Sequence, residues 1–274
     1  MTEFAFVPRR RTDWDGLRKL ARGGDAGAIL QLAQRLSEAG ESTEAEQWFR
    51  RAAAQGSGPA MAGLGALLAA DGRISGAIRW FEFAIAAGCP RADQQLGTLY
   101  LERGDFDAAE VWFLPAAEDG LPEALCNMGV VASRRGFTRE ARHWYERAVR
   151  AGSPTAMRTL GVYLAREGKI ERAITLLTEA VRRGRADAMA VLGAIFLELG
   201  DWVEGERWLR RGAAADDADS MFHLARFLRE QQVRPDVPAA SARAKAQAHK
   251  DARYWLERAA ALRHPEAMRL LHNL

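Results

Sequence analysis

Apolar residues recur at helical spacing in short segments that glycine separates. Residues 57–88 show the pattern, with a first apolar stripe at Ala60, Leu64 and Leu68. A four-residue spacing places side chains on one face of a helix. A second stripe follows at Ala77, Trp80, Phe81 and Ala84. Gly72 and Gly88 come directly after the two stripes, where glycine can adopt the left-handed backbone that ends a helix. The segment therefore predicts two antiparallel helices joined by short turns.

This pattern returns every 32 residues. Tryptophan holds one position of the repeat, at Trp48, Trp80, Trp112, Trp144 and Trp208. Leu176 is the exception in this series. Glycine holds three further positions, of which Gly24, Gly40 and Gly65 are examples. A fixed period of this length is typical of a solenoid, in which each unit buries its apolar face against its neighbours. We expect the tryptophans to pack between successive helix pairs.

The period divides the chain into seven predicted repeats. They are residues 25–56, 57–88, 89–120, 121–152, 153–184, 185–216 and 217–263. The last repeat is 15 residues longer than the others, and the excess falls near 231–246, where two prolines predict a loop. Residues 13–24 and 264–274 look like half repeats that cap a single solenoid spanning 13–274. Residues 1–12 are expected to form a flexible arm.

The repeats resemble a known family. The segments 45–56 and 141–152 are similar to the second helix of a Sel1-like repeat, a subgroup of the tetratricopeptide-type repeats. The first-helix pattern Ala-x-x-x-Leu-Gly-x-x-Tyr occurs between Ala92 and Tyr100. Here the turn between the two helices is shorter than in typical Sel1-like units, which places the chain between the two subfamilies.

The resemblance covers about residues 13–274 and has consequences for fold and function. It implies an all-α fold, a right-handed α–α superhelix of antiparallel helix pairs with seven repeats and capping helices. Proteins of this kind usually serve as adaptors in multiprotein complexes. The family has no shared catalytic residues to transfer, so the expectation is a protein without enzymatic activity.

Composition sets a few further limits. The chain is 48% hydrophobic, and its net charge of +3 is too small to indicate nucleic-acid binding by itself. Its two cysteines, Cys89 and Cys126, have no framework spacing, which favours a reducing compartment. No apolar run is long enough to span a bilayer, and no secretory leader is visible. We expect a cytoplasmic protein without membrane insertion, and the abundance of Ala, Arg and Gly suggests a bacterial source.

Motifs that carry catalytic or metal chemistry are missing. The five histidines form no His-Glu-x-x-His arrangement, and the glycines follow the repeat and not a phosphate-binding loop. Gly104-Asp105 and Gly200-Asp201 recur between helices, where aspartate is expected to cap the next helix. The expectation is therefore no catalytic residue, no metal site and no cofactor.

Side chains on the free face of the first helices are the predicted partner-binding surface. The candidates are Gln94, Thr98, Asn127, Arg134, Arg158, Arg166, Phe222, His223, Arg226 and Arg229. Arginine suits bidentate capture of a carboxylate. We expect this face to form a concave groove for a protein or peptide partner that offers an acidic segment or a C-terminal carboxylate.

Several alternatives stay open. The arginines of this face could instead pair with Glu198 and Glu230. The insert and the basic N-terminal arm could associate with nucleic acid in a regulatory protein. Incomplete caps would allow weak homo-oligomers in place of a monomer.

Overall fold

The computed structural model describes residues 14–230 and 242–272, with side chains for 14–230 and 247–271. This part of the chain contains sixteen helices and no strand, so the all-α prediction is confirmed. The helices are α1 (Asp15–Arg22), α2 (Ala26–Glu38), α3 (Ser42–Ala54), α4 (Gly58–Ala70), α5 (Ile74–Ala86), α6 (Ala92–Glu102), α7 (Phe106–Glu118), α8 (Pro122–Arg134), α9 (Thr138–Arg150), α10 (Pro154–Arg166), α11 (Ile170–Arg182), α12 (Ala188–Glu198), α13 (Trp202–Ala214), α14 (Ala218–Glu230), α15 (Ala242–Ala261) and α16 (Pro265–His272).

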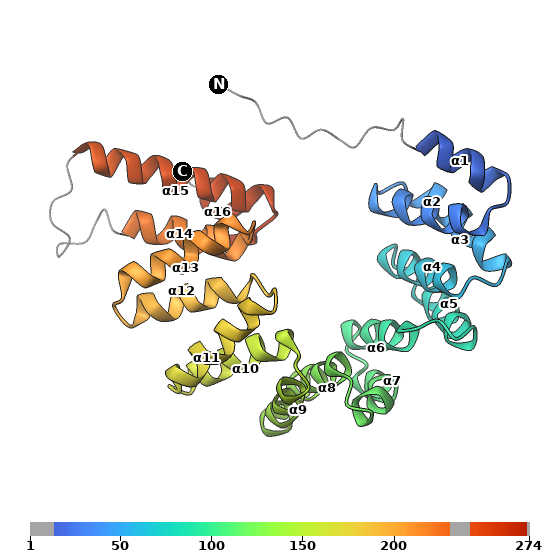
Figure 1. Cartoon of the computed structure of the whole chain (residues 1–274), viewed down its shortest axis with the longest axis horizontal. Helices are drawn as coiled ribbons and strands as arrows, with labels where there is room; N and C mark the ends of the chain where they lie inside the picture. Colours follow the sequence, from blue (N-terminus) through green and yellow to red (C-terminus); the bar gives the residue numbers. More distant parts are fainter. Residues whose placement is uncertain (1–13, 231–241, 273–274) are drawn as a thin grey trace. The chain divides into compact units, whose positions relative to one another are not determined.

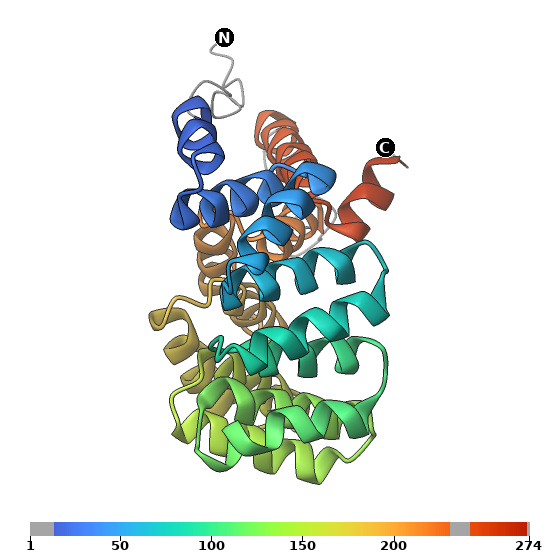
Figure 2. The ribbon, with the colours of Figure 1, turned by 90° about the vertical axis from the view of Figure 1, so that its right-hand side faces the viewer.

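The helices form two compact units (Figure 1). Unit 1 extends to Asp119 and also includes Arg134–Gly136. Unit 2 comprises Gly120–Ser133 and the chain from Phe137 onward. Within unit 1, successive helix pairs stack in chain order (Figure 2). That both units form one continuous solenoid stays a prediction, and the proposed arm at residues 1–12 and the loop at 231–241 lie outside the described residues.

The predicted helix ends are present. Asp105 Oδ1 accepts the Ala108 N–H at 3.2 Å, and Asp201 Oδ1 accepts the Glu204 N–H at 3.1 Å. These contacts satisfy backbone donors that the first turn leaves unpaired. Gly72 follows α4 with φ of 74°, a left-handed backbone that costs glycine nothing. The recurrent Gly-Asp pairs are thus structural.

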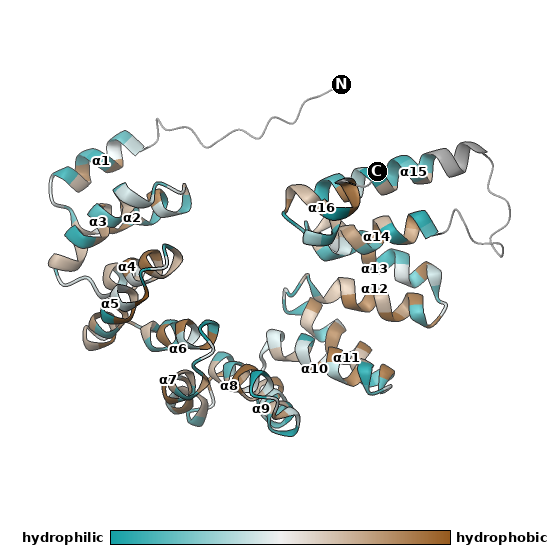
Figure 3. Cartoon of the chain, turned by 180° about the vertical axis from the view of Figure 1, so that it is seen from behind, coloured by the Kyte–Doolittle hydropathy of each residue, from teal (hydrophilic) through white to brown (hydrophobic). Residues whose placement is uncertain are grey.

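Five helix pairs, from α4–α5 to α12–α13, are held together by a glycine on the first helix and a large apolar residue on the second. A Cβ atom on Gly97 of α6 would lie 2.6 Å from the Phe113 ring of α7. Gly129 faces Tyr145 and Gly161 faces Leu177 in the same way, at 2.6 and 2.7 Å. Since real Cβ atoms do not approach this closely, glycine is required for the ring or isobutyl group to reach the facing helix. Among these first helices, α12 consists mostly of hydrophobic residues (Figure 3).

The tryptophans flank this core and do not form it. Trp48, Trp80 and Trp112 are half-buried and pack against the core cluster of unit 1, which confirms that they serve packing. The residue that directly follows the tryptophan position is the buried one in each repeat; Phe113 and Leu177 are examples, each 0% exposed. The tryptophans therefore pack at the edge of the core, and the residue after each of them lies inside it.

An arginine one turn later covers several of these indoles. The Arg147 guanidinium lies 4.4 Å from the Trp144 ring centroid, and Arg211 lies 5.0 Å from that of Trp208. A cation over an indole face is a stabilising arrangement. On the other side, the indole N–H of Trp144 donates to Glu140, four residues earlier, at 3.3 Å. The outer surfaces of α3, α9 and α13 thus carry an acid, a tryptophan and an arginine in the same order.

Candidate partner-binding surface

The predicted partner-binding residues divide between the two units. Gln94, Thr98 and Arg134 belong to unit 1. The others belong to unit 2: Asn127, Arg158, Arg166, Phe222, His223, Arg226 and Arg229. Thr98 is exposed, but its hydroxyl donates to the Gln94 carbonyl of its own helix at 2.9 Å. Within the described residues, the arrangement of candidates can therefore be traced only inside unit 2.

One position of the predicted face is buried. Phe222 was predicted to face the groove, yet it is only 6% exposed, and Cys126 at the equivalent position of α8 is only 4% exposed. A helix in a stack of pairs also contacts the pair that follows it, which covers this flank: Phe222 stacks on His264, and Cys126 lies beside Ser153. Phe222 is therefore a packing residue. Burial also raises the pKa of Cys126 to about 11, which keeps it a thiol at neutral pH.

Two of the predicted arginines already have acidic partners. Arg158 Nε lies 3.1 Å from Asp187 Oδ2, although the angle does not make a hydrogen bond. Arg226 Nη2 lies 3.5 Å from Glu230 Oε1, one helical turn away. The alternative of local pairing is thus confirmed for Arg226 with Glu230. These two guanidinium groups are partly neutralised within unit 2.

An aromatic cluster joins α14 to α16. The Phe222 ring stacks on His264 with a centroid distance of 4.5 Å, and Arg226 lies 5.9 Å from the Phe222 centroid. His264 Nδ1 accepts the Ala267 N–H, while its Nε2 lies 3.1 Å from Asp219 Oδ1. Nδ1 thus accepts from the backbone, and Nε2 is the nitrogen that faces Asp219. The cluster fixes the last helix in place.

His223 beside this cluster differs from a surface histidine. Desolvation by burial lowers its pKa, and the charge of Arg226 adds to the effect. Loss of hydration disfavours the imidazolium form. His223 is therefore neutral at pH 7 and offers no cationic contact to an acidic partner.

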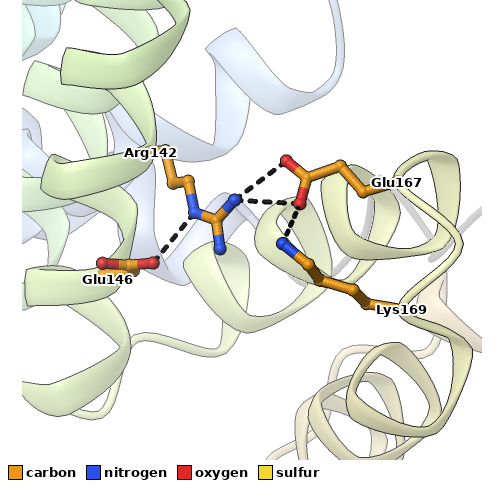
Figure 4. Close-up of polar contacts among 4 residues, drawn as sticks. All are labelled: Arg142, Glu146, Glu167 and Lys169. Carbon is orange, nitrogen blue, oxygen red and sulfur yellow. Dashed lines mark hydrogen bonds and ion pairs between the residues drawn. The ribbon is translucent and has the colours of Figure 1, made fainter.

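A network of ion pairs connects α9 to the turn that precedes α11 (Figure 4). Arg142 Nη1 donates to both carboxylate oxygens of Glu167 at 2.9 Å, and its Nε donates to Glu146 at 3.0 Å. Lys169 Nζ donates to Glu167 at 2.7 Å. The hydrogen bonds from Lys169 and then Arg142 lower the pKa of Glu167. The network fixes Glu146 on one rim of the pocket described below.

The same contact occurs one repeat earlier with its charges exchanged. In unit 1, Arg135 in the turn before α9 donates to Glu110 and Asp107 of α7. Arg135 and Glu110 lie 32 residues before Glu167 and Arg142. The turn thus carries the cation in one repeat and the anion in the next. The ion pair is retained in both repeats because the charges of both partners are exchanged.

Reversal of Arg142 is expected to destabilise unit 2. Arg142→Glu would set three carboxylates side by side, and like charges at this range repel. The double variant Arg142→Glu/Glu167→Arg recreates the polarity of Glu110 and Arg135, so its unfolding midpoint should return towards that of the wild type. Thermal unfolding at low and high salt measures both effects. A double variant no more stable than Arg142→Glu would show that the pair contributes nothing.

A pocket of about 430 Å³ opens beside α11 in unit 2. Its lining residues are Glu146, Val149, Arg150, Leu160, Arg172, Thr175 and Leu176. They come from α9, α10 and α11. Sequence reasoning did not assign this site, although the break in the tryptophan series at Leu176 was its signal.

The described residues give no sign of metal chemistry or of a membrane span. No group of three or more His, Cys, Asp or Glu side chains among them could hold a metal ion. None of their helices combines the length and the apolar character that crossing a membrane requires.

Comparisons with known proteins agree with this architecture. A tetratricopeptide repeat family model matches residues 126–185 and 159–220, and a second tetratricopeptide repeat model matches residues 90–114. The comparison with curated protein sequences found no match.

Solved structures of repeat proteins share the fold. A Sel1 repeat protein from Oxalobacter formigenes is 22% identical with a TM-score of 0.57, over 82% of this chain and 99% of that one. PilF from Pseudomonas aeruginosa is 18% identical with a TM-score of 0.55, over 70% and 91% of the two chains. A chain of the Cut9–Hcn1 hetero-tetramer of APC/C is 18% identical with a TM-score of 0.54, over 80% and 46%. With its matched repeats and its helix pairs, the chain is a repeat protein of the Sel1-like and tetratricopeptide type.

Proposed function

We propose that this chain is a non-enzymatic adaptor that binds a protein or peptide partner through the first helices of its repeats. Repeat folds of this type are typical of protein–protein interaction scaffolds. The structurally similar Cut9–Hcn1 chain is itself part of a hetero-tetramer. A cytoplasmic location and a bacterial origin belong to the same proposal.

Unpaired arginines on the first helices carry the proposal. Arg166 at the end of α10 is exposed, and Arg229 near the end of α14 is half-exposed. Within residues 14–230 and 247–271 neither forms an ion pair, in contrast to Arg158 and Arg226. Because arginine binds carboxylates through two parallel hydrogen bonds, these side chains suit an acidic segment or a chain terminus.

Charge reversal of these arginines is expected to abolish partner capture. The full-length protein and the variant Arg166→Glu/Arg229→Glu would each be used as bait in lysate of the native host, with bound proteins identified by mass spectrometry. A partner enriched by the wild type should fall at least tenfold with the variant, since two carboxylates would then face its acidic groups.

A charge-matched control separates this effect from net charge. Arg79→Glu/Arg139→Glu changes two exposed arginines on second helices and should leave capture intact. Equal capture by the wild type and by Arg166→Glu/Arg229→Glu would refute the proposed surface. Loss of all captured protein on nuclease treatment would favour the nucleic-acid alternative, which depends on segments outside the described residues.

A further inference from the structure

The fifth repeat differs from the others at three outer positions. In α3, α9, α13 and α15 the second helix carries an acid, a tryptophan and an arginine at these positions, as in Glu140, Trp144 and Arg147, whereas α5 and α7 keep only the tryptophan. The corresponding residues of α11 are Arg172, Leu176 and Glu179. The indole is replaced by a smaller side chain, and the two charges that flank it are exchanged. The pocket of about 430 Å³ lies at Leu176 and Arg172.

The next repeat shows how a tryptophan is accommodated at the position of Leu176. Trp208 occupies it in α13, and its indole nitrogen is buried without a hydrogen-bond partner in the described chain. An indole in this position is half-buried, with its nitrogen on the covered side. Leu176 is shorter, so in the fifth repeat the space beside α9 and α10 is open and is lined by Val149, Leu160 and Leu176.

The rim of this pocket is positive. Arg150 and Arg172 are both exposed, and neither has an ion pair within the described chain. Glu146 is neutralised by Arg142 at 3.0 Å. Glu179, one turn after Leu176, is bound to Arg183 at 2.7 Å. Two free guanidinium groups therefore border an apolar pocket, and they complement carboxylates and aromatic faces.

We propose that this pocket binds an aromatic side chain of a partner peptide, with acidic residues on both sides of it. The inserted ring takes the place that the chain's own tryptophan fills in other repeats. The flanking carboxylates pair with Arg150 and Arg172. This inference rests on the proposed adaptor function and specifies the chemistry of a partner segment. That segment would bind at the second helices, whereas the arginines of the proposed function lie on the first helices.

The test uses a fluorescein-labelled peptide with the sequence Asp-Glu-Trp-Asp-Glu and the full-length protein, followed by fluorescence polarisation. Saturable binding is expected, at least tenfold weaker when the peptide tryptophan is alanine. Leu176→Trp restores the repeat and fills the pocket, so it should weaken binding at least tenfold. Arg172→Glu should do the same through its charge, whereas Arg79→Glu, an exposed arginine of unit 1, should bind like the wild type.

Circular dichroism of each variant shows whether it folds, and Arg172→Glu is a surface change that tests the pocket if Leu176→Trp does not fold. Absence of saturable binding to the wild type, or equal binding by Leu176→Trp, would overturn the proposal. A decrease in mass by light scattering in Leu176→Trp alone would instead assign the pocket to a second copy of the chain. Partner capture that depends on Arg166 and Arg229 but not on Leu176 would reject the pocket and keep the adaptor function.

Discussion

Phe113→Ala is expected to lower the free energy of unfolding of unit 1 by about 3–5 kcal/mol. The Phe113 ring is 0% exposed and packs directly on Gly97. Because Gly97 has no side chain, it cannot fill the space that the ring would leave. Removal of the ring leaves a cavity between α6 and α7 that neighbouring backbone cannot close. Because a stack of repeats depends on contacts between neighbours, the loss should be largest in this pair.

Denaturant unfolding and hydrogen exchange together measure this loss. Amides of α6 and α7 should lose protection first, since the cavity lies between them. Phe137→Ala is the matched control because it deletes the same ring from a side chain that is 54% exposed. A change of less than about 1 kcal/mol in Phe113→Ala would mean that the glycine–aromatic contact does not hold the pair together.

Gly212→Ala is expected to destabilise the contact between α13 and α14, by about 1–3 kcal/mol. The added Cβ would lie 2.0 Å from the Ser220 Oγ and 2.6 Å from its Cβ. The equivalent positions of other repeats hold two alanines, as in Ala148 with Ala156. Gly212 and Ser220 are thus a paired exchange, in which a smaller residue makes room for a larger one.

The double variant Gly212→Ala/Ser220→Ala should recover part of this loss, because it removes the Oγ atom that lies closest to the added Cβ but keeps the Cβ of residue 220. It restores the alanine pair and removes the Ser220 hydroxyl, which is buried without a partner in the described chain. A double-mutant cycle by denaturant unfolding gives the coupling energy. Additive effects of the two changes would contradict a direct steric contact.

Much of the fold could be predicted from the sequence, because the same pattern of helix-forming, capping and turn residues occurs in several repeats. The helix pairs, the aspartate caps and the glycine ends follow from spacing and backbone preference alone. Side-chain depth was harder to predict, since Trp112 and Phe113 are adjacent and both apolar. Only the close approach at Gly97 shows that the phenylalanine is the buried one.

The candidate surface was less predictable for a related reason. Helical spacing identifies which residues share a face, but not which flank of a helix the next repeat covers, so the prediction for Phe222 was wrong. The ion pair between Arg158 and Asp187 joins residues far apart in sequence, and the 32-residue period does not predict it. By contrast, the exception at Leu176 could be found without coordinates because a regular series makes a single deviation visible.

The exchanged ion pairs also determine which repeats can be neighbours. Deletion of residues 121–152 would keep the 32-residue period, yet it would bring Glu167 opposite Glu110 and Asp107, the residues that Arg135 now neutralises. Three carboxylates would meet where a guanidinium is required. The repeats are therefore not interchangeable modules, and their order along the chain is encoded in the sign of the charges at their junctions.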